Sequence, residues 1–221
     1  MTVLFVIATF MVFVLIDYVS RRNVPSDART EPLFPEAAAV EPVWVAGYQL
    51  PESLHYHRGH TWTRPMDADN VVVGMDDFAR RLLGPAREMR LPAVGTWLRQ
   101  GESGFGVTVD DRTAELVSPI EGEVVEVNEA LREQPTLATD DPYGRGWLVK
   151  VRTADLTANL RNLLSGRLAR RFIEDAREGL DLRLMALSGS VLQDGGEPVA
   201  DFAKHLPVAE WKRLVGEFLL T

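Results

Sequence analysis

Short apolar runs alternate with turn residues through the middle of this chain of 221 residues. The runs are rich in valine: 71–74 (VVVG), 106–109 (GVTV), 114–117 (AELV), 122–128 (GEVVEVN) and 146–151 (GWLVKV). Glycine, proline, asparagine and aspartate separate them, as expected for strands joined by turns. A single short helix is expected at residues 76–83, with Asp76 as its N-cap and Gly84 just past its end. Short strands at even spacing predict a small β-barrel or sandwich.

Longer strings of residues stand in a fixed order across residues 54–172. They are 60–62 (HTW), 74–79 (GMDDFA), 83–84 (LG), 91–95 (LPAVG), 118–131 (SPIEGEVVEVNEAL) and 141–151 (DPYGRGWLVKV). In their order and spacing they resemble the glycine cleavage system H protein family. The resemblance implies a mainly β fold with flanking helices (α+β), the barrel-sandwich hybrid of the lipoyl and H-protein type. We assign this domain to residues 54–153.

The resemblance also implies a functional lysine. In the family it sits at a hairpin tip, carries lipoate in amide linkage, and lets the lipoyl arm carry an aminomethyl group between enzymes. Counting back from the Ser-Pro string, this lysine falls on Asp111, with Asp110 and Arg112 beside it. The acidic residue that the family has three positions earlier falls on Thr108. A guanidinium is no substitute, because it stays protonated and is not a primary amine.

Lysine is scarce in the whole chain. The three lysines are Lys150, Lys204 and Lys212, and none lies near the expected tip in the sequence. We therefore predict that the protein carries no lipoate and no other cofactor. Two alternatives remain for the paired aspartates: a solvated turn, or a charge-reversed tip that changes partner recognition. An acid–base pair or a metal clamp is a weaker alternative, because both carboxylates are expected to face water.

The first 22 residues predict a transmembrane signal anchor. Residues 3–16 (VLFVIATFMVFVLI) are almost wholly apolar, and Arg21 and Arg22 follow the apolar stretch. Residues 2–19 just reach the length needed to cross a bilayer. The positive-inside tendency places the rest of the chain on the cytoplasmic side of a single-pass membrane protein. Four prolines lie between residues 23 and 43, at positions 25, 32, 35 and 42. Prolines at this spacing favour an extended chain, so residues 23–53 are predicted to be a linker.

Residues 154–221 predict a helical extension. Apolar residues recur every three or four positions from Leu156 to Leu180, with Asp155 as a possible cap and Gly166 as a possible break. A helix is also expected over 199–206, and a last helix from Pro207 with a stripe that includes Trp211 and Phe218. That stripe either packs back on the domain or binds a partner helix. The candidate protein-interaction residues are Asp110, Asp111, Arg112, Trp211 and Phe218.

Three histidines, His55, His57 and His60, lie within the string HYHRGH. Imidazoles two residues apart on a strand share a face, so they form a weak candidate metal site. We predict no metal, since no carboxylate lies beside them in the sequence and His60 has a counterpart in the family. The chain has no cysteine, which excludes disulfides, thiolate metal sites and a cysteine nucleophile.

Charge and motifs limit the function further. The net charge of −8 argues against non-specific nucleic-acid binding. No nucleophile elbow or phosphate-binding glycine loop is present in the sequence. Three hypotheses follow: a membrane-anchored, non-lipoylated H-protein-like binding or scaffolding module that is no enzyme, a lipoyl carrier of glycine cleavage, and a histidine-dependent metal protein. The partners implied are the membrane and a protein, with the glycine cleavage and lipoylation enzymes as candidates.

Overall fold

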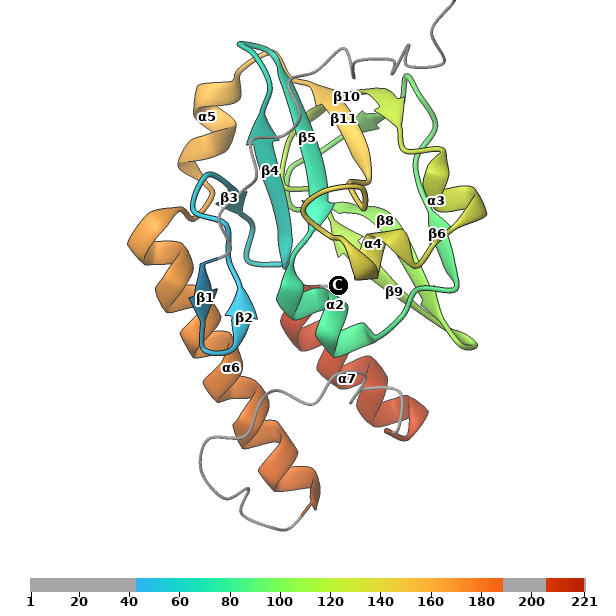
Figure 1. The fold of residues 1–221 in the computed structure, drawn as a ribbon, viewed down its shortest axis with the longest axis vertical. Helices are drawn as coiled ribbons and strands as arrows, with labels where there is room; N and C mark the ends of the chain where they lie inside the picture. The colour runs from blue at the N-terminus through green and yellow to red at the C-terminus, as the bar shows by residue number, and fades with distance from the viewer. Residues whose placement is uncertain (1–42, 189–205, 221) are drawn as a thin grey trace, which may run out of the picture. The chain divides into compact units, whose positions relative to one another are not determined.

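Two antiparallel sheets enclose the core of the domain (Figure 1). The structure is a computed structural model that describes residues 43–188 and 206–220. A six-stranded sheet has the order β3-β4-β5-β11-β10-β7, and a three-stranded sheet has the order β6-β8-β9. Their strands are β3 (His55–Tyr56), β4 (Thr61–Pro65), β5 (Asn70–Met75), β6 (Glu88–Arg90), β7 (Trp97–Leu98), β8 (Ser103–Val109), β9 (Arg112–Val117), β10 (Gly122–Val127) and β11 (Val149–Arg152). The mainly β architecture with flanking helices is therefore confirmed.

The strands that were expected from the valine-rich runs form, and each buries its apolar residues. Val71 and Val73 of β5, Val107 of β8, Val124 of β10 and Val151 of β11 are fully enclosed in the core. β11 begins at Val149, three residues later than predicted, because the backbone of Gly146 still belongs to the preceding turn and donates to the carbonyl of Asp141.

Helix α2 (Asp77–Leu83) starts and stops where the sequence predicts. The Asp76 side chain accepts a hydrogen bond from the backbone N–H of Ala79 at 2.8 Å, which caps the first turn. Gly84 follows the last turn with φ +91° and donates its N–H to the carbonyl of Arg80. The other carboxylate oxygen of Asp76 forms a hydrogen bond with His60 Nδ1, at 2.8 Å. This bond links the N-terminus of α2 to the loop before β4.

Phe78 of α2 is the centre of an aromatic cluster. Its ring centroid lies 4.1 Å from that of His60, 5.2 Å from that of Tyr48 and 5.3 Å from that of Phe218. The other face of His60 stacks on Phe172 at 4.7 Å. Residues far apart in the sequence therefore meet on one ring.

The predicted linker ends earlier than residue 53. β1 (Trp44–Val45) and β2 (Tyr48–Gln49) form a small hairpin, and Tyr48 is buried. Tyr143 joins this hairpin to α2, because its hydroxyl donates to the Gln49 carbonyl and accepts from the Asp77 N–H. Burial raises the pKa of Tyr143 well above its ordinary value, so the phenol stays protonated and able to donate. The folded unit thus includes residues assigned to the linker.

The remaining helices are short turns and a C-terminal pair. α3 (Ala130–Glu133) and α4 (Leu137–Asp140) connect β10 to β11, while α5 (Leu156–Arg161) and α6 (Gly166–Ser188) follow β11. Asp155 caps α5 as predicted, accepting from the Ala158 N–H at 2.8 Å. Gly166, at φ +50°, marks a break between two helices, so the apolar stripe from Leu156 does not belong to one helix.

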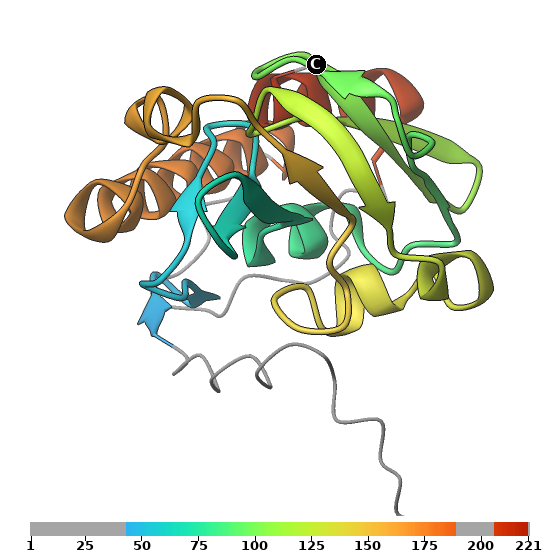
Figure 2. The ribbon, with the colours of Figure 1, turned by 90° about the horizontal axis from the view of Figure 1, so that it is seen from above.

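Helix α7 (Val208–Leu219) packs back on the domain beside α2 and α6 (Figures 1 and 2). Trp211, Leu214, Val215 and Leu219 are buried, and Phe218 lies against Phe78 and near Gly179 of α6. Of the two alternatives, the structure shows the one in which the stripe packs on the domain, which covers Trp211 and most of Phe218. Pro207 precedes the helix rather than opening it.

The predicted membrane anchor, at residues 1–22, lies outside the described residues, and so does most of the helix expected at 199–206. Among residues 43–188 and 206–220, no helix is long and apolar enough to cross a bilayer.

We expect Phe78→Ala to lower the free energy of unfolding by about 3–5 kcal/mol, because it removes the ring on which three aromatic partners meet. The matched control is Leu168→Ala on the exposed side of α6, which should change stability by less than about 0.5 kcal/mol. Urea unfolding of both variants measures the difference. Similar losses would contradict the central place of Phe78.

Candidate functional site

The predicted hairpin tip is the turn between β8 and β9. Val109 pairs with Arg112 in the strand register, which leaves Asp110 and Asp111 as a two-residue turn. Asp110 has φ +53°, a conformation that aspartate tolerates better than most residues. Just below the turn, the hydroxyl oxygens of Thr108 and Thr113 lie 3.0 Å apart across the two strands. The sequence therefore placed this tip correctly.

The side chains of both aspartates lie in solvent. The Asp111 side chain is 89% exposed, and its carboxylate lies 3.9 Å from the Arg112 guanidinium. Asp110 is exposed as well. The tip is thus a solvated acidic turn, as the first of the two alternatives predicts.

Arg112 turns back from the tip and holds the hairpin to α7. Its Nη1 donates to the carbonyl of Leu206 at 2.8 Å, and its guanidinium lies 5.9 Å from the Trp211 ring centroid. Only 20% of this side chain is exposed. Arg112 is therefore engaged within the domain, and most of this candidate interaction residue is covered by the chain itself.

Lipoate does not fit the residues at this tip. Its attachment needs a primary amine, and Asp110, Asp111 and Arg112 offer none. In the described part of the chain the lysines are Lys150 and Lys212. Lys150 lies on β11, where its Nζ contacts Glu126 at 2.7 Å and the Trp147 ring at 5.1 Å. Lys212 is exposed on α7.

The three histidines do not converge. His60 is buried against Asp76 and two aromatic rings, and His57 Nδ1 accepts from the Gly59 N–H at 3.0 Å. The Nδ1 atom of His55 is buried without a hydrogen-bond partner. Nowhere in residues 43–188 and 206–220 do three histidines or carboxylates come together as metal ligands. The histidine-dependent metal hypothesis therefore gains no support from the geometry.

The family model for the glycine cleavage H-protein matches residues 54–176, which is more than half of the chain. The chain belongs to the glycine cleavage H-protein family. The H protein of Carboxydothermus hydrogenoformans is 38% identical over 130 residues, covering 58% of this chain and 98% of that protein. The probable H protein of Thermococcus gammatolerans is 32% identical, covering 59% and 96%.

A solved structure agrees with this membership. The crystal structure of a glycine cleavage system H protein from Mycobacterium marinum superposes with a TM-score of 0.50 at 30% identity. It covers 57% of this chain and 98% of that one. The resemblance inferred from the sequence strings is confirmed.

The H-protein match leaves out two elements of this chain that pack on the matched part. The β1–β2 hairpin precedes residue 54, and α7 follows residue 176. The sequence reasoning missed the hairpin, whose signal was a glycine between apolar residues at 45–48. It also missed that Val94 and Trp97 stand exposed after β6, although the string 91–95 was noted for the resemblance.

We expect Asp111→Lys to become a substrate of a lipoate–protein ligase, because the new amine would stand on an exposed hairpin tip. Asp110→Lys, one residue away on the same turn, is the control and should stay unmodified. The full chain is incubated with ligase, lipoate and ATP, and intact mass spectrometry counts the added groups. A double variant, Thr108→Glu with Asp111→Lys, supplies the family acid as well. Equal modification at both positions, or none in the double variant, would show that Asp111 is not the position of the family lysine.

His57 should make the fold less stable in acid. Burial first, then the nearby His60 and Arg58, lower the pKa of His57 below its ordinary 6.5. The unfolded chain therefore binds this proton more tightly than the folded one. Its contribution to the free energy of unfolding is complete above about pH 6.5 and falls as the pH drops toward the lower folded pKa.

Protonation would also remove the acceptor for the Gly59 N–H. Urea unfolding at about pH 7.5 and about pH 5.5 measures the loss. His57→Asn keeps an acceptor that does not titrate, so it should lose less stability between the two pH values. A loss as large as in the parent would exclude His57 as the cause.

Proposed function

We propose that this protein is a membrane-anchored, non-lipoylated member of the H-protein family that acts as a protein-binding or scaffolding module rather than as an enzyme. The observation that carries the proposal is the hairpin tip. Asp110 and Asp111 form its exposed turn, at the position where the resemblance places the lipoyl lysine. A carrier needs an amine there, and the tip presents carboxylates.

One further observation supports the absence of lipoate, and another supports a binding role. The amine of Lys150 lies on β11 against Glu126 and Trp147, with a side chain only 12% exposed. The hairpin is also held at β9 by α7, through Arg112 and Trp211. A hairpin fixed along one edge suits a rigid recognition surface, since less freedom is lost on binding.

The membrane part of the proposal rests on the sequence. Residues 3–16 carry no charge, and Arg21 and Arg22 follow them. This pattern supports a single-pass anchor with the H-protein-like domain on the cytoplasmic side. The partners we propose are proteins, with the glycine cleavage and lipoylation enzymes as first candidates. The family membership supports these candidates.

The second candidate function is a lipoyl carrier in glycine decarboxylation. It is favoured by the relatives, which are named as H proteins of the glycine cleavage system. On this hypothesis lipoate would be attached to a lysine elsewhere in the chain.

Intact mass spectrometry separates the two functions. We expect the full-length protein, extracted in detergent from its native membranes, to have the mass of the unmodified chain. The positive control is the Asp111→Lys variant expressed in the same host, which shows that lipoylation operates there. A lipoyl adduct on any residue of the parent protein would overturn the non-lipoylated function.

A further inference from the structure

The loop between β6 and β7 exposes apolar side chains to solvent. Residues 91–97 (LPAVGTW), here named the 91–97 loop, contain no charged residue. The Val94 side chain is 63% exposed and Trp97 is 56% exposed. The two side chains lie three residues apart on one loop, and exposed apolar patches mark interaction sites on soluble domains.

The loop is held rigidly in this arrangement. The Gly95 N–H donates to the Val124 carbonyl at 2.8 Å, and the Val124 N–H donates to the Thr96 carbonyl at 2.9 Å. The Thr96 N–H closes the turn onto the Ala93 carbonyl at 3.1 Å. Gly95 has φ +87°, which a side chain would disfavour. The apolar side chains are thus fixed outward rather than free to fold back.

Two clefts adjoin the loop, one at each end of it in the sequence. One of about 350 Å³ has Trp97 as a wall and is completed by Asp69, Glu123, Arg152, Thr153 and Ala154. The other, of about 530 Å³, is lined by Leu91 and Pro92 of the loop and by Arg90, Ser103, Gly104 and Glu115. Each cleft is rimmed by an ion pair, Arg152 with Glu123 and Arg90 with Glu115. An apolar ridge between polar clefts has the composition of a protein interface.

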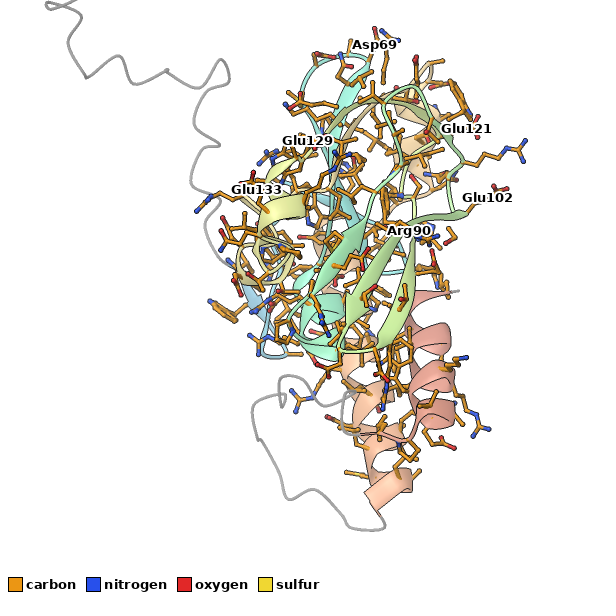
Figure 3. All side chains as sticks on the ribbon, turned by 90° about the vertical axis from the view of Figure 1, so that its right-hand side faces the viewer. Asp69, Arg90, Glu102, Glu121, Glu129 and Glu133 are labelled. Carbon is orange, nitrogen blue, oxygen red and sulfur yellow. The ribbon has the colours of Figure 1, made fainter. Side chains whose placement is uncertain are left out.

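Two unpaired carboxylates lie near this ridge: Asp69 lines the cleft beside Trp97, and Glu121 directly precedes β10, the strand paired with β7. Asp69 and Glu121 are exposed, and neither side chain has a partner within the described residues. Figure 3 labels both on the same side of the molecule as Glu102, Glu129 and Glu133, of which Glu102 pairs with Arg99 and Glu129 with Arg132. The chain as a whole carries a net charge of −8. The field of this face therefore favours a cationic partner.

We propose that the 91–97 loop and its two clefts form a docking surface for a basic protein segment that places an apolar side chain beside Trp97. This inference rests on the proposed binding function and names its surface. Nucleic acid and anionic lipid are disfavoured by the carboxylates. A second copy is also disfavoured, because a two-fold contact through this surface would bring two copies of the same acidic face together.

The 91–97 loop continues from one edge of the sheet that contains the β8–β9 hairpin. β9, at one edge of the three-stranded sheet, is covered by α7. β6 forms the other edge and leads directly into the 91–97 loop.

Fluorescence anisotropy with three labelled peptides tests the surface on the full chain in detergent. The first peptide has a Leu-Phe-Leu core flanked by arginines, the second replaces the arginines by glutamates, and the third replaces the core by serines. We expect the first to bind at least about tenfold more tightly than either of the others. Its affinity should fall with salt, and also in the Asp69→Asn, Glu121→Gln double variant.

Two tryptophan variants locate the contact. Trp97→Ser should weaken the first peptide by about tenfold or more, as expected for the loss of an aromatic anchor. The matched control is Trp44→Ser, since Trp44 is 59% exposed on β1, and this variant should bind as the parent does. Thermal unfolding of both variants checks that neither has lost the fold.

Equal binding of the basic and acidic peptides, equal loss in the two tryptophan variants, or no binding would overturn the docking surface. Intact mass of the same sample keeps this failure separate from that of the proposed function. If the chain is unmodified but binds no peptide, only the docking surface is contradicted. If the chain carries a lipoyl adduct, the proposed non-lipoylated function is contradicted as well.

Discussion

The contact of Asp76 with His60 joins the parts of this fold. One carboxylate oxygen caps α2 through the Ala79 N–H, and the other meets His60 Nδ1, with both side chains almost wholly buried. Phe78 then stacks on one face of His60 and Phe172 on the other. A buried polar pair of this kind is stable only when its atoms are satisfied, so the loop, α2 and α6 have to assemble together.

The β1–β2 hairpin and α7, which lie outside the family match, both pack on the ring of Phe78. Tyr48 of β2 and Phe218 of α7 both pack on Phe78. α7 also packs against β9, and Arg112 of β9 donates a hydrogen bond to the Leu206 carbonyl just before α7. These contacts fix the hairpin whose tip carries the two aspartates. The β9 edge of the sheet is thereby closed within the chain.

Local patterns carried much of the prediction. Valine-rich runs predicted β5, β8, β9 and β10, and the Asp76 cap and Gly84 predicted both ends of α2, because these signals act within a few residues. The turn at Asp110 and Asp111 followed from the spacing to the Ser-Pro string. The break at Gly166 was foreseen only as a possibility, since a glycine lowers helix propensity without deciding where a helix ends.

Non-local contacts decided the rest. The β1–β2 hairpin has too little periodicity to be seen in sequence, and it exists because Gln49 meets both Asp77 and Tyr143. The exposure of Trp97 could not be inferred either, since an aromatic residue in a strand is as often buried.

By itself the sequence determined the family, the strand order along the chain and the absence of an amine at the tip. These depend on residue identity and spacing alone. Only the tertiary structure decided that Trp211 and Phe218 face inward, that Arg112 binds α7, and that Val94 and Trp97 stand in solvent. Those outcomes depend on which surfaces cover one another, and burial is a property of the assembled fold.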